Sequence, residues 1–164
     1  MKQLIFMRHA KANADSFDGT DFARELAPKG IEEAKFIRNK LLKTAYKPSC
    51  IVASPAARTK KTASYFSEEF ASAKQSFEFG MYEAAFEDLF ELIRNLDDKD
   101  ETVMMVGHNP SIMLIISFIS NANLYKMPTA GIVIVKFKEK LWKNIQKRTG
   151  EIVWSLDPKG GELV

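Results

Sequence analysis

The sequence is poor in cysteine and has no long hydrophobic run. Its single cysteine, Cys50, excludes an internal disulfide framework and fits a reducing compartment, so we expect a cytoplasmic location. The longest apolar stretch, Ile112 to Ile119, is far short of the ~18 residues that a membrane span needs. The apolar run in the opening MKQLIFMRHA is too short for a signal-peptide core. We therefore expect no membrane association.

Several kinds of catalytic site are also missing. There is no G-x-x-x-x-G-K-[ST] loop, which excludes nucleotide hydrolysis of the P-loop type. Cys50 cannot be a nucleophile of the C-x5-R kind, because Ala56 stands where the arginine should be. The two histidines lie far apart, with no H-E-x-x-H motif and no cysteine pair, which argues against a zinc site. We expect neither a metal nor a cofactor.

The charge is only slightly unbalanced. Of 164 residues, 24 are Lys or Arg and 21 are Asp or Glu, a formal net charge of +3. This excess suits anionic small molecules or phosphorylated partners, but it is too small to indicate nucleic-acid binding. The length is typical of one domain, residues 1–164, and nothing in the sequence indicates an oligomeric state.

Short strand-like runs alternate with helix-period segments. We predict strands over Gln3–Met7, Ser49–Ala53, Ser76–Phe79, Thr102–Val106, Gly131–Phe137 and Ile152–Leu156. Apolar residues at helical spacing predict amphipathic helices over residues 29–45 and 86–96. The dipeptides Ser54-Pro55 and Asn109-Pro110 predict two more helices, each with a polar cap followed by proline at the first helical position.

This alternation predicts an α/β fold, a three-layer α/β/α sandwich with a central, mostly parallel sheet. Asp15 to Gly30 reads as a long polar loop, of a length that is commonly functional or disordered. The basic tract from Lys136 to Arg148 could meet an anionic partner, but a solvated hairpin or loop is the favoured interpretation.

The two histidines have parallel settings. LIFMRH and TVMMVGH are each an apolar strand that ends in His9 or His108. Ligands of open α/β sheets bind at the carboxyl ends of strands, so the two imidazoles converge if these strands are neighbours. A lone histidine is more often structural than catalytic, but two at equivalent strand ends favour a functional site.

Two arginines accompany these histidines. Arg8 precedes His9, and Arg58 lies in the first turn of the helix that follows CIVAS; standing alone, Arg58 would be read as a surface arginine. Guanidinium groups match phosphate oxygens, and helix N-termini favour anions. A histidine with a pKa of ~6.5 is mostly neutral near pH 7, so His9 could act as a nucleophile on a phosphate.

Three motifs together resemble the histidine phosphatase superfamily, whose fold is the phosphoglycerate mutase-like one. They are RHAKA after the first strand, SPAARTKKT after the second and VGHNPSI after a later one. DFARELAPKG is similar to the D-x-x-R-x-L-(T)-x-x-G segment of its small SixA-like phosphohistidine phosphatases, and MYEA and GEIVWSLDP also fit that branch. Ala27 departs from the usual threonine, which weakens a helix cap but affects no catalytic residue.

The resemblance implies a role for each matching residue. His9 would be the nucleophile, and Arg8, Arg58 and His108 would hold the phosphate without a metal. Glu83 in MYEA is the candidate general acid, with a solvated loop carboxylate as the alternative interpretation. Arg24 would either reach the substrate phosphate or anchor its loop through an ion pair.

Three functions remain open on the sequence. The leading one is a metal-independent phosphohistidine phosphatase acting on a signalling protein or peptide, because the compact chain leaves few residues for a lid. The runner-up is a small-molecule phosphomonoester hydrolase with the same residues, favoured if the loop from Asp15 to Gly30 closes over the pocket. A non-catalytic phosphate-binding module is the third.

Overall fold

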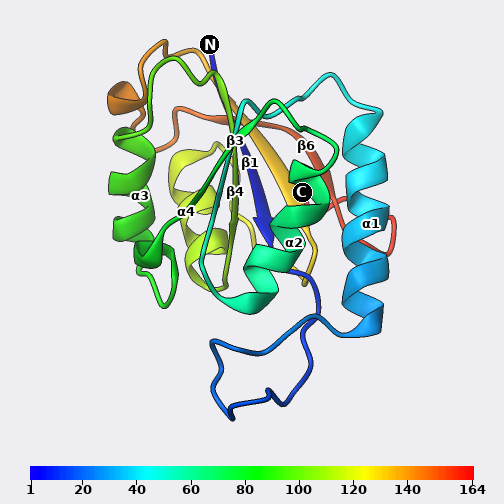
Figure 1. Cartoon of the computed structure of the whole chain (residues 1–164). Coiled ribbons are helices and arrows are strands. Elements are labelled where there is room, and N and C mark those ends of the chain that lie inside the picture. Colours follow the sequence, from blue (N-terminus) through cyan, green and yellow to red (C-terminus); the bar gives the residue numbers. More distant parts are fainter.

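In a computed structural model that describes all 164 residues, six strands form one sheet in the order β3-β2-β4-β1-β5-β6. The strands are β1 (Lys2–Arg8), β2 (Cys50–Ala53), β3 (Lys74–Phe77), β4 (Thr102–Gly107), β5 (Ile132–Phe137) and β6 (Glu151–Leu156). The four strands β1, β2, β3 and β4 run parallel to one another, and β5 runs antiparallel to its neighbours β1 and β6. The prediction of a mostly parallel sheet is confirmed (Figure 1).

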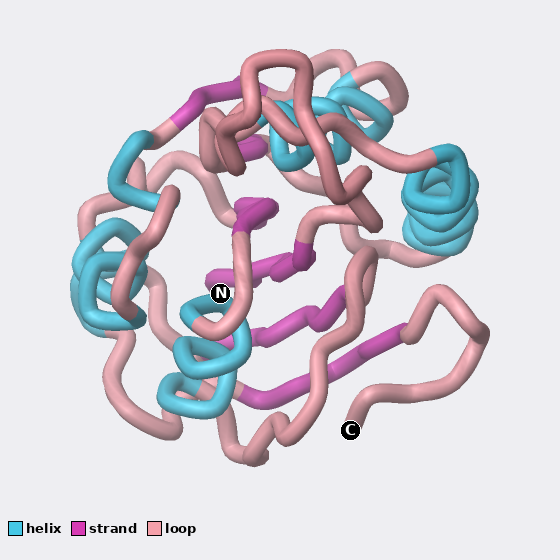
Figure 2. The backbone as a smooth tube through the Cα atoms, turned by 90° about the horizontal axis from the view of Figure 1, so that it is seen from below, coloured by secondary structure: helices cyan, strands magenta, loops and turns pink.

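Two helices cover each face of this sheet. α1 (Pro28–Leu42) and α2 (Ala57–Ser67) lie on one face, and α3 (Phe86–Arg94) and α4 (Ser111–Ile119) lie on the other. Strand residues alternate between the two cores: Leu4 and Phe6 pack toward α3 and α4, while Ile5 and Met7 pack toward α1 and α2. Figure 2 shows the strands side by side between the helical layers, so the three-layer sandwich is confirmed.

Two predicted boundaries are wrong for reasons of local packing. The third strand starts earlier and ends at Phe77, because Phe79–Met81 forms a 3₁₀ helix that buries Met81. The loop after β1 ends at Ala27, since Pro28 to Gly30 already form the first turn of α1. Gly30 is needed there, because a Cβ would clash with the Lys11 backbone.

The predicted caps at Ser54 and Asn109 are also wrong. α2 begins at Ala57 behind Ala56, and α4 begins at Ser111 behind Pro110, in both cases without a side-chain cap. Ser54 is instead fully buried and bonded to His108, and the Asn109 amide donates to the carbonyl of Met127. Arg58 nevertheless stays in the first turn of α2, as predicted.

The basic tract from Lys136 to Arg148 is not simply a solvated loop. It contains the end of β5 and the 3₁₀ helix Trp142–Asn144, and it buries Trp142 and Ile145 in the core against α3 and α4. Four lysines of the tract remain exposed at the surface, namely Lys138, Lys140, Lys143 and Lys147. None of the helices is of the length and apolarity that crossing a bilayer requires.

Candidate active site

The site lies at the carboxyl ends of β1 and β4. These strands are neighbours in the sheet, and their register places Arg8 opposite Gly107, so the two histidines follow side by side. The His9 amide donates to the Gly107 carbonyl at 3.0 Å, and the two imidazole centroids are 5.2 Å apart. The convergence that the sequence pattern predicts is therefore present.

Arg58 reaches both imidazoles from the first turn of α2. Its Nε lies 3.3 Å from His9 Nε2, and its Nη2 lies 3.3 Å from His108 Nδ1. The side chain is only 7% exposed, so water screens its charge little within the site. The guanidinium thus connects the two strand ends.

The partners of the two imidazoles fix their tautomers. His9 Nδ1 lies 2.8 Å from the Ala10 carbonyl, which can only accept, so Nδ1 carries the proton. Arg58 can only donate, so His9 Nε2 and His108 Nδ1 present lone pairs to it. His108 then donates from Nε2 to Ser54 Oγ at 2.8 Å.

Both histidines are held neutral. Burial lowers the pKa of His9 to about 3, although the hydrogen bond to Ala10 favours the charged form. Burial, followed by the positive charge of Arg58, lowers the pKa of His108 to about 4. Near pH 7 the Nε2 lone pair of His9 is therefore available to attack an electrophile.

Arg8 supplies a second cation to the same place. Its Nη1 donates to the Met127 carbonyl at 3.1 Å, and its buried Nε has no partner. Burial and the nearby charge of Arg58 lower the pKa of Arg8, but a guanidinium remains protonated. An unused buried donor beside a second guanidinium is an arrangement that an anion would satisfy.

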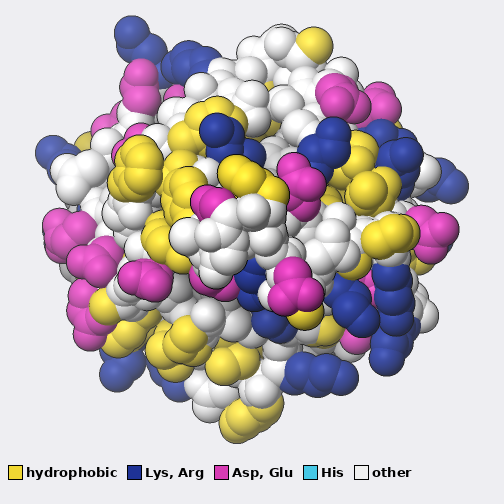
Figure 3. Space-filling view, turned by 60° about the horizontal axis from the view of Figure 1, so that its bottom comes forward, with side chains coloured by type: hydrophobic (Ala, Val, Ile, Leu, Met, Phe, Trp, Pro, Cys, Tyr) yellow, Lys and Arg dark blue, Asp and Glu magenta, His cyan; other side chains and the backbone are white.

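We call the cavity around these groups the histidine pocket. It has a volume of about 230 Å³ and is lined by Arg8, His9, Asp21, Arg58, Tyr82, Glu83, His108 and Asn109. Figure 3 shows the face at the lower end of the sheet, where basic and acidic side chains lie close together and neither histidine is visible. Both imidazoles are indeed buried, at 8% and 9% exposure.

Asp21 and Tyr82 line this pocket although the sequence analysis did not select them. Asp21 Oδ2 accepts from Arg58 Nη2 at 2.9 Å and from the Tyr82 hydroxyl at 2.8 Å. Burial alone would raise the pKa of Asp21, but hydrogen bonds from Tyr82, Arg24 and Arg58 lower it well below its usual range. The D-x-x-R motif contained the aspartate, but no local signal linked it to Arg58.

Glu83 and Arg24, the other two residues selected from the sequence, lie in different settings. Glu83 is exposed at the rim of the pocket, and its backbone has a positive φ of 54°. Arg24 does not line the pocket. Its Nε donates to the Asn13 carbonyl and its Nη1 pairs with Asp21 at 3.0 Å, contacts that anchor its own loop.

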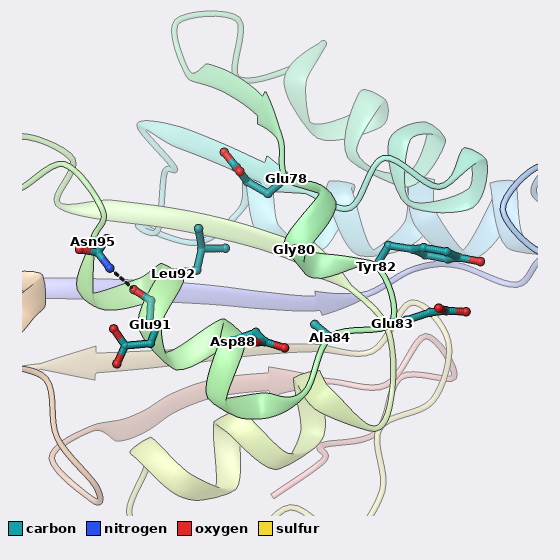
Figure 4. Close-up of a pocket in the computed structure, with 9 residues that line it drawn as sticks. All are labelled: Glu78, Gly80, Tyr82, Glu83, Ala84, Asp88, Glu91, Leu92 and Asn95. Atoms are coloured by element: carbon teal, nitrogen blue, oxygen red, sulfur yellow. Dashed lines mark hydrogen bonds between the residues drawn. The ribbon is translucent and has the colours of Figure 1, made fainter.

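A larger groove adjoins the pocket and shares Tyr82 and Glu83 with it. This groove has a volume of about 500 Å³ and runs along α3 past Glu78, Asp88 and Glu91. Figure 4 shows the side chains of Tyr82 and Glu83 extending to the same side. No three His, Cys, Asp or Glu side chains come together in the chain as a metal-ion cluster.

The N-termini of α2 and α4 contribute less than the sequence pattern suggested, since neither Ala57 nor Ser111 lines the pocket. The first amide of α2, from Ala57, is already bonded to the Phe22 carbonyl at 3.0 Å. This leaves the guanidiniums and imidazoles as the main groups for an anion. Their charges and donors suit a tetrahedral oxyanion.

Comparisons with known proteins agree with this arrangement. No protein-family model matches the chain. Two uncharacterized proteins from strains of Mycobacterium tuberculosis are each 28% identical over 141 residues, covering 79% of this chain and 86% of their own.

Solved structures have the same fold over nearly the whole chain. A protein assigned as the phosphohistidine phosphatase SixA of Agrobacterium tumefaciens is 26% identical with a TM-score of 0.81, over 96% of this chain and 98% of its own. The protein histidine phosphatase SixA in complex with tungstate is 17% identical with a TM-score of 0.77, over 96% and 97%. In its fold and its paired strand-end histidines, the chain is thus similar to the SixA-like phosphatases of the histidine phosphatase superfamily.

Proposed function

We propose that this phosphatase uses His9 as its nucleophile and removes phosphate from phosphohistidine in a signalling protein or peptide. One observation carries the proposal: the proton of His9 is held on Nδ1 by Ala10, so the Nε2 lone pair faces the pocket beside Arg58. A neutral imidazole aimed at a cationic pocket is the arrangement that in-line attack on phosphorus needs.

The reaction has two steps. His9 Nε2 forms a bond to phosphorus while the bond from phosphorus to the leaving group breaks, which gives a phosphohistidine at His9. Water then attacks that phosphorus, restores the imidazole and releases inorganic phosphate. Arg8, Arg58 and His108 would hold the phosphoryl oxygens, since phosphoryl transfer depends mainly on positioning and charge stabilisation.

Glu83 is the proposed proton donor to the leaving group. Of the two carboxylates that line the pocket, Asp21 is held ionised by its three hydrogen-bond donors and cannot supply a proton. Glu83 stands at the exposed rim, where a leaving group would depart. A phosphohistidine substrate needs this acid less than an ester does, because imidazole is the better leaving group.

The shape of the pocket supports a protein substrate. We call residues 9 to 27 the β1–α1 loop. Apart from His9, this loop contributes only Asp21 to the lining of the pocket. Tyr82 and Glu83 open the pocket toward the groove along α3, which leaves room for the chain around a phosphorylated residue. We propose no nucleic-acid or membrane partner.

A small phosphate ester is the second candidate substrate. Asp21 brings the β1–α1 loop against Arg58 and forms one wall of the pocket, which is a partial closure. Arg24 would then act through this loop by anchoring Asp21, rather than by touching the phosphate.

Turnover of a phosphohistidine peptide, compared with a panel of small phosphate esters, tests the proposal. We expect the peptide to be hydrolysed with the highest kcat/KM and the His9→Ala variant to be inactive on every substrate. A preference for one small ester would select the second candidate. Full activity of His9→Ala would remove the nucleophile assignment, and binding without turnover by the wild type would indicate a phosphate-binding module.

A further inference from the structure

We infer that Asp21 is a positioning residue, which holds one edge of the Arg58 guanidinium so that the other edge faces the phosphoryl group; this rests on the proposed function. The backbone carbonyl of Asp21 accepts from Arg58 Nη1 at 2.7 Å, and its carboxylate accepts from Nη2 at 2.9 Å. One residue thus engages both terminal nitrogens of the guanidinium.

The partners of Arg58 divide between two edges of its planar group. Nη1 and Nη2 form the edge that Asp21 occupies, while Nε and Nη2 form the edge that faces His9 and His108. The contacts to Asp21 are short, and those to the imidazoles are long at 3.3 Å. A phosphoryl group on His9 would therefore take the edge with the weak contacts and leave Asp21 in place.

Asp21 is itself held from several sides. Its second carboxylate oxygen pairs with Arg24 at 3.0 Å, and the Tyr82 hydroxyl donates to the first. The neighbouring Phe22 packs edge-on against Tyr82, with ring centroids 5.1 Å apart, and its carbonyl accepts from the Ala57 amide. The orientation of Arg58 therefore depends on the β1–α1 loop.

The alternative role for Asp21, filling the anion site, predicts the opposite change in anion affinity. If the carboxylate simply filled the anion site, its removal would strengthen anion binding, because a negative charge would be lost from the pocket. If it positions Arg58, its removal weakens anion binding despite the more positive charge. The sign of the change in affinity separates the two roles.

Tungstate is the probe, with its Kd measured by calorimetry beside kcat and KM on a phosphohistidine peptide. We expect Asp21→Ala to weaken tungstate binding and to lower kcat by roughly 10- to 100-fold, as misplacement of a catalytic group by about 1 Å does. Asp21→Asn, which keeps an oxygen acceptor, should recover part of both losses. Asp18→Asn is the matched control, because Asp18 bonds only within the same loop.

A double-mutant cycle shows whether Asp21 acts through Arg58. In the Arg58→Ala background we expect Asp21→Ala to cause no further loss of tungstate affinity or of kcat. Tighter tungstate binding by Asp21→Ala, an unchanged kcat, or an additive loss in the Arg58→Ala background would overturn the inference. If coupling between Asp21 and Arg58 appears in tungstate binding while the wild type turns over no substrate, the proposed function fails and the positioning role stands.

Discussion

Arg58 Nε lies 3.3 Å from Nε2 of His9, the ring nitrogen left unprotonated by the hydrogen bond of Nδ1 to Ala10. A guanidinium next to a lone pair disfavours protonation of the imidazole, and this long contact is one that a substrate phosphoryl group would displace. The same cation is in place to stabilise the charge that develops on a transferred phosphoryl group.

Protein stability should fall steeply in mild acid. Both histidines are neutral when folded, with pKa values of about 3 and 4, whereas an unfolded histidine binds a proton below its usual pKa of ~6.5. Their contribution is thus present above pH ~6.5 and is lost as the pH falls toward the folded values. Between pH 7 and pH 5, each histidine should lower the free energy of unfolding by about 2 kcal/mol.

Urea unfolding at the two pH values measures this loss. The His9→Asn variant, which lacks one titrating ring, should lose about 2 kcal/mol less than the wild type over the same interval. If the wild type and His9→Asn lost the same free energy of unfolding, His9 would not be held neutral by burial.

Replacing Glu83 should separate good from poor leaving groups. We expect Glu83→Gln to slow hydrolysis of an alkyl phosphate by roughly 10²- to 10⁴-fold, with a much smaller effect on a phosphohistidine peptide. Glu87→Gln, at an exposed glutamate in the first turn of α3, is the control. Equal losses on both substrates, or no loss on either, would exclude Glu83 as the acid.

Chelation should leave activity unchanged. Two guanidiniums face the pocket, and Nδ1 of His9 and both ring nitrogens of His108 are engaged by protein groups, so the surroundings favour anions over a metal cation. Turnover before and after prolonged EDTA treatment measures this. Inhibition that a divalent metal reverses would contradict the metal-free mechanism.

Substitution of Gly30 should destabilise the fold near the site. A Cβ there meets the Lys11 backbone, so Gly30→Ala should cost about 1–3 kcal/mol, as overpacking does. Gly80→Ala is the control, because a Cβ at Gly80 meets nothing within 4 Å. Equal melting temperatures for the two variants would show that the first turn of α1 can shift.

The sequence was enough to predict the sheet, the four helices and the convergence of His9 with His108. The helices and strands follow from the period of the hydrophobic residues, and the convergence follows from the common direction of neighbouring parallel strands. The caps at Ser54 and Asn109 were wrong, because the tertiary partners His108 and Met127 take those side chains. Asp21 could not be connected to Arg58, since that contact depends on how the β1–α1 loop folds against the first turn of α2.

The most direct test of the central claim is to trap the phosphorylated enzyme. Wild-type protein is mixed with substrate, quenched in base during turnover and digested, and the peptide that contains His9 is analysed by mass spectrometry. We expect a phosphoryl group on His9, absent from the His9→Ala variant. Turnover with no phosphate on His9, or with phosphate on His108 instead, would contradict the account.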